Sequence, residues 1–312
     1  MPRRCAWFAW LRPTLLCAAG CIMLNGEGIA NMELKNILCP VDFSPLSALG
    51  LRYAGVLAQC GNAQLSVAYA NTFAPPPYFT ESKLRALEEQ YRESFHEAEA
   101  ALRRFVDANV QGELARRAGL FVEEGLPVDV IRRIAAQIRA DLIVMGTHGR
   151  TGVNRWMLGS VAERVLRESA IPVLTVRGDT SAPAEPPKKI LCPVNDTPAA
   201  QQAIVVASQI GRCFDSSVTA VHVHERGDAN RIEDLCAWIP PEARSHCAVT
   251  EMVREGDAET EIIGLAKALG ADLLVIGVEH RRFFDATVLG STAARVVRHA
   301  PCPVMTVPRH PE

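Results

Sequence analysis

Apolar residues along the chain form two alternating patterns, short continuous runs and longer stretches with helical spacing. The continuous runs predict strands buried on both faces of a sheet, at 36–41, 64–70, 119–123, 141–146 and 172–177. The stretches with helical spacing predict helices at 46–60, 81–109, 127–139 and 160–169. This alternation predicts an α/β fold, with a five-stranded parallel sheet and helices on both of its faces.

The same order of segments occurs a second time in the chain. The matching pairs are 37–42 with 190–195, 140–146 with 271–277, and 159–165 with 290–296. The offset is 153 residues at the first pair and 131 at the second, so copy two is shorter by about two dozen residues. We assign the loss to the long charged helix at 81–109. The repeat predicts two domains, 33–178 and 188–308, joined by a linker at 179–187 that is rich in proline and small residues.

Composition excludes several classes of partner and site. The net charge of -2 and the aromatic content of 6% give no reason to expect nucleic acid or an anionic membrane surface as a partner. The ten cysteines include no Cys-x-x-Cys pair, so no zinc site is expected. Cys39, Cys60, Cys192 and Cys213 lie in or beside apolar segments, which predicts small buried side chains. Reduced thiols of this kind are typical of a cytoplasmic protein, and that is the expected location.

Residues 1–31 have two explanations. Arg3 and Arg4 precede a short apolar run at 15–24 that contains Cys21, as in a signal or lipoprotein leader. This run is too short to span a bilayer, and the lipoprotein pattern lacks its usual leucine. We therefore favour a true start at Met32, with 1–31 as translated leader sequence. A native chain whose first residue is Cys21 would contradict this interpretation.

The candidate chemistry follows the apolar run at 141–146. Gly146 and Gly149 stand at the end of this predicted strand, and Gly159-Ser160 opens the next predicted helix. Glycines let the main chain approach a ligand closely, and a helix N-terminus presents free N–H groups to an anion. The spacing therefore predicts a phosphate-binding loop.

This loop resembles that of the nucleotide-binding members of the universal stress protein family. These members carry Gly-x-x-Gly, nine residues, and then Gly-Ser or Gly-Thr, and copy one matches every position. The resemblance covers nearly all of residues 33–308, as two tandem Rossmann-like domains. It implies binding of an adenine nucleotide (ATP, ADP or AMP), with Mg²⁺ as a possible accompanying ion. The implied site in copy one consists of Pro40, Val41, Asp42, Ala70, Met145, Gly146, Gly149, Arg150, Gly159, Ser160 and Val161.

Some of these residues have a structural alternative. Asp42 would accept hydrogen bonds from the ribose or the adenine amino group, but it would alternatively cap the following helix, a role open to Ser44 as well. Met145 would pack on the base or sugar, or belong to the core. Ser160 would bind a terminal phosphate, or serve only as a helix N-cap. Ala70 would present its backbone to adenine.

Two further side chains of the loop, His148 and Arg150, are candidate catalytic residues. His148 is expected on an exposed loop, and no serine or carboxylate is spaced to form a triad with it. Arg150 would offer its charge to a phosphate. No catalytic residue is assigned on this basis.

Copy two departs from the motif at two positions. His280 stands where the second glycine belongs, and Asn195 replaces the aspartate of the first strand, although Gly290 and Ser291 are kept. A side chain at position 280 would obstruct the loop. We therefore expect one competent nucleotide site, in copy one, with copy two largely structural. Binding with altered geometry in copy two is the alternative.

The leading functional hypothesis is an ATP-binding stress-response sensor or regulator without fast turnover. The alternatives are a slow ATP hydrolase or nucleotidyl transferase on the same fold, and a scaffold that binds no nucleotide. Family members usually dimerise through their last strand, so the strands at 172–176 and 303–307 are expected to pair within this chain as an internal pseudo-dimer. Association of two chains into a homodimer stays open.

Overall fold

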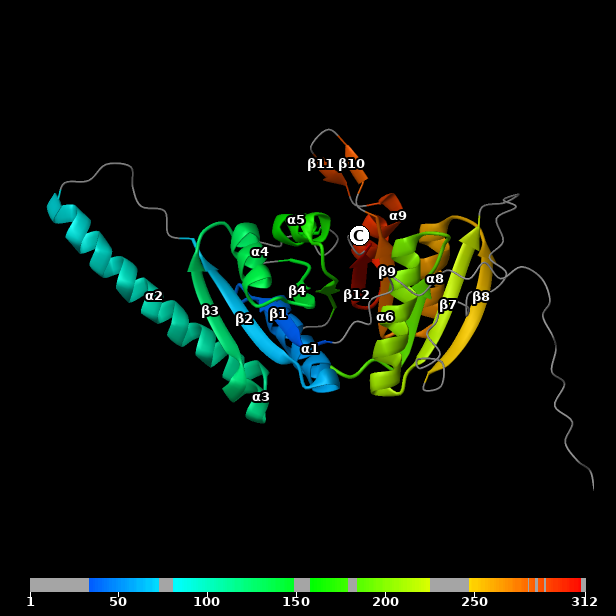
Figure 1. Cartoon of the computed structure of the whole chain (residues 1–312), viewed down its shortest axis with the longest axis horizontal. Helices are drawn as coiled ribbons and strands as arrows, with labels where there is room; N and C mark the ends of the chain where they lie inside the picture. Colours follow the sequence, from blue (N-terminus) through cyan, green and yellow to red (C-terminus); the bar gives the residue numbers. More distant parts are fainter. Residues whose placement is uncertain are drawn as a thin grey trace, which may run out of the picture.

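The strands and helices of this computed structural model form two α/β domains (Figure 1). The structure describes residues 34–72, 81–148, 158–178, 184–224, 247–279, 281–283, 286–288 and 290–309. Domain 1 contains β1 (Asn36–Pro40), α1 (Pro45–Gly61), β2 (Gln64–Asn71), α2 (Glu81–Asn109), α3 (Gly112–Arg117), β3 (Gly119–Glu124), α4 (Pro127–Gln137), β4 (Leu142–Gly146), α5 (Ser160–Glu168) and β5 (Val173–Val176). Domain 2 contains β6 (Lys189–Pro193), α6 (Pro198–Phe214), β7 (Ser217–His224), β8 (Ala248–Glu255), α8 (Ala258–Leu269), β9 (Leu273–Val278), β10 (Arg281–Phe283), β11 (Ala286–Val288), α9 (Ser291–His299) and β12 (Val304–Pro308).

One continuous sheet of ten strands runs through both domains, in the order β3-β2-β1-β4-β5-β12-β9-β6-β7-β8. Each domain contributes five parallel strands, and the halves join where β5 pairs with β12 in antiparallel register. Two buried threonines reinforce this seam, because the Thr175 hydroxyl donates to the Val304 carbonyl at 3.1 Å and the Thr306 hydroxyl donates to the Val173 carbonyl at 3.3 Å. The predicted fold class and the predicted pairing of the last strands are both confirmed.

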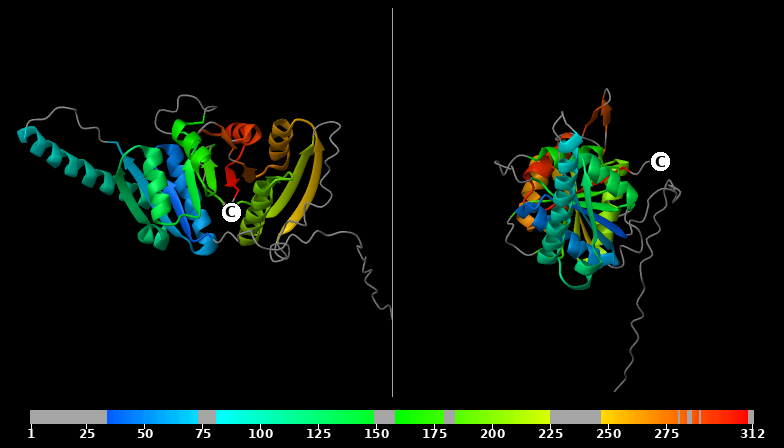
Figure 2. Two further views of the ribbon diagram at one scale, coloured as in Figure 1. Left: turned by 45° about the horizontal axis from the view of Figure 1, so that its top comes forward. Right: turned by 90° about the vertical axis from the view of Figure 1, so that its left-hand side faces the viewer.

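Helices cover both faces of the sheet (Figures 1 and 2). Alternate side chains of a strand point to opposite faces, so Ile37 and Cys39 pack on one side of β1 and Leu38 on the other. The first core lies under α1, α2 and α6, and the second lies under α4, α5, α8 and α9. Each core contains residues of both domains, so the seam is part of the packed interior.

The loss in copy two falls where the sequence predicts it. Ser66 pairs with Gly119 in domain 1, and its equivalent Thr219 pairs with Thr250 in domain 2. The offset between the copies therefore changes from 153 residues to 131 residues between these two strands. In domain 1 this connection holds α2, which extends away from the sheet beyond β3 (Figure 1).

Two short features were not predicted. Helix α3 follows α2 directly, and the β10–β11 hairpin lies in the glycine loop of domain 2. The hairpin stands off the main sheet, and β11 approaches α5 of domain 1 (Figure 1). Residues 1–31, with the predicted leader, lie outside the described residues.

The cysteines divide into two groups. Cys39 and Cys192 are fully buried free thiols, as predicted, and burial raises the pKa of both. Cys60 and Cys213 instead form a disulfide and are only half-buried, so their interpretation as small buried side chains without a redox role is wrong. The reason is geometric: they occupy equivalent positions at the ends of α1 and α6, which pack beside each other, and their Cα atoms are 5.7 Å apart.

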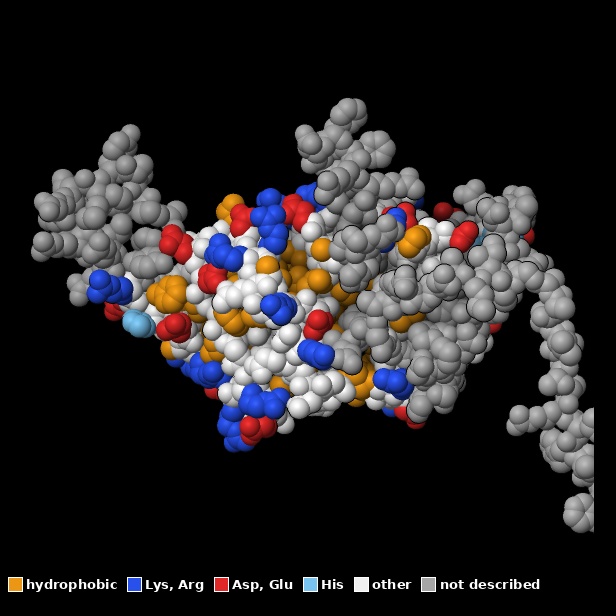
Figure 3. All heavy atoms as spheres, viewed as in Figure 1, with side chains coloured by type: hydrophobic (Ala, Val, Ile, Leu, Met, Phe, Trp, Pro, Cys, Tyr) orange, Lys and Arg blue, Asp and Glu red, His pale blue; other side chains and the backbone are white. Residues whose placement is uncertain are grey.

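None of the helices in the described ranges combines the length and the apolar character needed to cross a bilayer. On the face seen in Figure 3, Lys and Arg side chains alternate with Asp and Glu side chains over domain 1. This mixture agrees with the nearly neutral composition of the chain.

Candidate functional site

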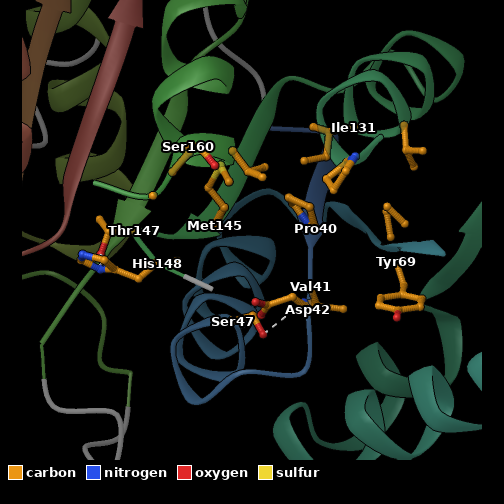
Figure 4. Close-up of a pocket in the computed structure, with 18 of the residues that line it drawn as sticks. Pro40, Val41, Asp42, Ser47, Tyr69, Ile131, Met145, Thr147, His148 and Ser160 are labelled. Carbon is orange, nitrogen blue, oxygen red and sulfur yellow. Dashed lines mark hydrogen bonds between the residues drawn. The ribbon is translucent and has the colours of Figure 1, made fainter. Parts of the chain in front are cut away.

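A cavity of about 460 Å³ opens at the carboxyl ends of β1, β2 and β4 in domain 1 (Figure 4). Strand order reverses between β1 and β4, which is where open parallel sheets bind ligands. The lining residues are Pro40, Val41, Asp42, Ser47, Ala68, Tyr69, Ala70, Thr72, Pro127, Val130, Ile131, Met145, Gly146, Thr147, His148, Gly159, Ser160, Val161 and Ala162. Nine of the eleven predicted site residues are in this set, whereas Gly149 and Arg150 lie outside the described residues.

The inner walls of the cavity are apolar. Four apolar residues line it from the segment just after β1, from α4 and from β4, namely Val41, Val130, Ile131 and Met145. The Val41 N–H donates to the Ala68 carbonyl at 2.8 Å, which fixes the end of β1 against β2. Met145 is 6% exposed, so it belongs to the core and also lines the cavity. Such walls suit a flat aromatic group.

Asp42 stands half-buried at the cavity edge, just after β1. Its carboxylate accepts a hydrogen bond of 3.0 Å from the Ser44 N–H, and its own N–H donates to the Ser47 hydroxyl at 3.4 Å (Figure 4). The N-cap of α1 is Ser44, whose hydroxyl accepts from the Ser47 N–H at 3.2 Å. The capping alternative for Asp42 is therefore wrong, and its carboxylate, which is bonded to the Ser44 N–H, borders the cavity.

Gly146 has a packing explanation that the sequence did not reveal. A Cβ at this position would stand 3.0 Å from the Leu46 Cβ and 3.1 Å from the Leu46 carbonyl carbon. Gly277 is tighter still, with 2.4 Å to the Ala199 carbonyl carbon. Both glycines therefore let the first turn of a neighbouring helix approach the sheet closely. This helix is α1 in domain 1 and α6 in domain 2. Their presence in both copies needs no ligand.

The N-terminus of α5 faces the other end of the cavity. Its N-cap is Gly159, which makes no side-chain capping bond, and the Gly159 N–H donates to the Thr147 carbonyl at 2.8 Å. Ser160 is the first helical residue and is exposed, so it is not the N-cap that one alternative required. The first N–H groups of a helix have no partner within the helix, and together with the helix dipole they favour an anion.

His148 is half-buried, and its predicted place on an exposed loop is wrong. The Thr147 hydroxyl lies 2.9 Å from its Nδ1, and its buried Nε2 has no hydrogen-bond partner among the described residues. Burial, and secondly the charge of Arg177, lower the pKa of His148. Arg177 extends from the end of β5 and donates to the carbonyls of Val297 and Ala300 at the end of α9, so it links the end of the cavity near His148 to domain 2.

Sequence reasoning missed several residues of the lining. They are Ser47, Ala68, Tyr69, Thr72, Pro127, Val130, Ile131, Thr147 and Ala162. Tyr69 and Thr72 flank Ala70 at the carboxyl end of a predicted strand, and Pro127 opens a predicted helix, so the strand-end rule was an available signal.

Domain 2 has a cavity of its own at the equivalent place, of about 510 Å³. It is lined by residues that include Asn195, Glu279, Gly290 and Ser291. The expected obstruction by His280 concerns a residue outside the described part of the chain.

Comparison with known proteins gives the family. The model of the universal stress protein family matches residues 33–177 and again 186–308. A universal stress protein of Mycolicibacterium smegmatis is 26% identical over 297 residues, which cover 87% of this chain and 96% of that protein. Universal stress protein MJ0531 of Methanocaldococcus jannaschii is 32% identical over 157 residues, which cover 50% of this chain and 87% of that protein.

A solved structure supports the arrangement of the fold. The crystal structure of a universal stress protein from Archaeoglobus fulgidus superposes with a TM-score of 0.67 at 21% identity, and the match covers 89% of this chain and 99% of that one. With the family model matched in both halves, this chain belongs to the universal stress protein family, as a tandem two-domain member.

Proposed function

We propose that domain 1 binds an adenine nucleotide, ATP in the first instance, and that the protein acts in the stress response as a sensor or regulator through occupancy of this site. One observation supports the proposal most: a single cavity has apolar walls, a carboxylate at one edge and a helix N-terminus without a side-chain cap at the other. These three features suit a base, a ribose and a phosphate chain, respectively.

The residues present fit such a ligand. The volume of about 460 Å³ is within the range of cavities that bind small molecules. Adenine would lie against Val41, Ile131 and Met145, with the backbone of Ala70 at its edge. The Asp42 carboxylate would accept hydrogen bonds from ribose hydroxyls, and the N–H groups of Ser160 and Val161 would face the phosphates. Mg²⁺ would enter with the phosphates.

The proposal places this function in the cytoplasm. In that reducing compartment Cys60 and Cys213 would be held as thiols, and the disulfide would form under oxidative conditions.

Calorimetry with ATP on the full chain and on a Ser160→Asp variant tests the proposal. An acidic residue in the first turn of a helix favours the helix through its dipole, so this variant is expected to fold normally. Its carboxylate would repel the phosphates, and we expect ATP affinity to fall at least tenfold.

The matched control is Ser291→Asp, which places the same charge at the same position of α9 in domain 2. This control is expected to bind ATP as the parent does. Absence of ATP binding by the parent, or an equal loss in both variants, would contradict the proposed site. Steady phosphate release at ordinary enzyme rates would favour a hydrolase instead.

A further inference from the structure

The cavity of domain 2 keeps the apolar end of the domain 1 cavity. Val194 donates its N–H to the Val221 carbonyl at 2.8 Å, the same bond and the same length as that between Val41 and Ala68. Ile262 on α8 is equivalent to Ile131 on α4. Ile276 on β9 is equivalent to Met145 on β4. The whole domain 2 cavity has a volume of about 510 Å³, similar to that of domain 1.

The opposite end of the cavity differs in charge between the two domains. In domain 1, Thr147 and His148 follow Gly146 and line the cavity. In domain 2, Val278 and the half-buried Glu279 follow the equivalent glycine and line the cavity. The hydroxyl is lost, and an imidazole is replaced by a carboxylate.

The nearby cation is lost as well. Val176 and Val307 occupy equivalent positions on β5 and β12, next to the two glycines. Arg177 follows the first and is close enough to His148 for its charge to lower the pKa of that imidazole. Pro308 follows the second, so domain 2 has no cation at the equivalent position.

The N-terminus of α9, with its Gly290 N-cap, lines the domain 2 cavity as α5 lines that of domain 1, so the difference between the cavities rests on these exchanges alone. A phosphate near Glu279 would face a partly desolvated carboxylate, and attraction or repulsion between charges grows as water is excluded. A neutral or positively charged group would face no such repulsion. Glu279 lines the cavity and is only half-buried, so its carboxylate borders the space that an occupant would fill.

We propose that domain 2 binds a nucleoside-like ligand that carries a neutral or positively charged group, and no phosphate, at the end facing Glu279. The nucleoside body rests on the function proposed for domain 1, whereas the choice of charge rests on Glu279, Val278 and Pro308. The chain thus has two sites of similar shape with opposite charge preference.

Three probes with one common body test the charge preference: 5′-amino-5′-deoxyadenosine, adenosine and AMP. Domain 1 is closed with Ala70→Trp, because Ala70 lines its cavity, and titration calorimetry then reports domain 2. We expect one site, with affinity in the order amine, adenosine, AMP, and at least tenfold between adenosine and AMP. The matched variant Val223→Trp, at the equivalent position of domain 2, should remove this site. If Ala70→Trp does not fold by circular dichroism, adenosine is titrated into the parent protein with ATP present at saturation.

Two charge changes separate the proposal from a general preference for adenosine. In Glu279→Gln, the ratio of the affinities for the amine and for AMP should fall at least fivefold. In His148→Glu, domain 1 should bind the three probes in the order of affinity expected for domain 2. Absence of adenosine binding with domain 1 closed, AMP binding at least as tight as adenosine, or an unaltered range in Glu279→Gln would each overturn the proposal. Failure of domain 1 to bind ATP would not affect the result with Ala70→Trp, so the two proposals fail separately.

Discussion

The disulfide between Cys60 and Cys213 should contribute a large part of the stability of the oxidised protein. It joins residues 153 positions apart, so breaking it releases a very long loop in the unfolded chain. The chain-entropy relation for a loop of this length gives about 5 kcal/mol at 25 °C, and measured contributions range from about 0 to 5 kcal/mol. The folded state should survive reduction, because the seam between β5 and β12 and both cores remain.

Urea unfolding, followed by far-UV circular dichroism with and without dithiothreitol, measures this contribution. With a slope of about 3 kcal/mol per molar urea, a loss of about 5 kcal/mol would lower the midpoint by roughly 1.7 M. We expect one transition under both conditions, since each core contains residues of both domains. In the double variant Cys60→Ala/Cys213→Ala the reductant should have no effect, which controls for the other cysteines. A parent midpoint that reduction changes by less than about 0.3 M would refute the reasoning.

Two further predictions concern Gly146 and His148. Gly146→Ala should lower the free energy of unfolding by about 1–3 kcal/mol in urea titrations, because its Cβ would press on α1. Gly264→Ala, in α8 with nothing within 4 Å of the added methyl, should instead raise that free energy by about 0.5–1 kcal/mol. Equal effects would contradict the packing role of Gly146. Arg177→Met should raise the pKa of His148, measured by NMR titration of the imidazole, because the positive charge of Arg177 lowers it. Because the pKa of His148 in the folded protein lies below the ordinary 6.5, the unfolded chain binds the proton first as the pH falls. The free energy of unfolding therefore decreases below pH 6.5, and it should decrease less in Arg177→Met than in the parent. An unchanged pKa would show that burial alone sets it.

The sequence predicted the sheet well because its strands are buried on both faces. Such strands appear as continuous apolar runs, so the predicted 141–146 and the observed Leu142–Gly146 differ by one residue. The pairing of β5 with β12 followed from the family resemblance and from two similar strands that each close a repeat. The strand-end rule gave the edge of the sheet on which the cavity lies.

The remaining features depend on contacts between distant segments. Helical spacing shows which residues share a face, but it does not show that Cys60 would meet Cys213 across the seam. The common offset of 153 residues was a signal, since it places both thiols at one position of the repeat. The burial of His148 depends in the same way on its surroundings, which include Arg177 from the end of another strand.

The seam between the domains limits which equivalent residues of the two copies can be substituted without loss of a contact between the domains. Thr175 and Thr306 bond across it, and Cys60 and Cys213 bridge it, so a change in one member of either pair removes a contact that both halves share. Glu279 lines a cavity and is not among the residues of either described core, so changing its charge leaves those cores unaltered. A duplicated domain can therefore keep one sheet and one fold while its two cavities acquire different charge preferences. In this chain a difference in ligand between the two cavities would come from the exchange of His148 for Glu279 and of Arg177 for Pro308, and not from the residues of the seam.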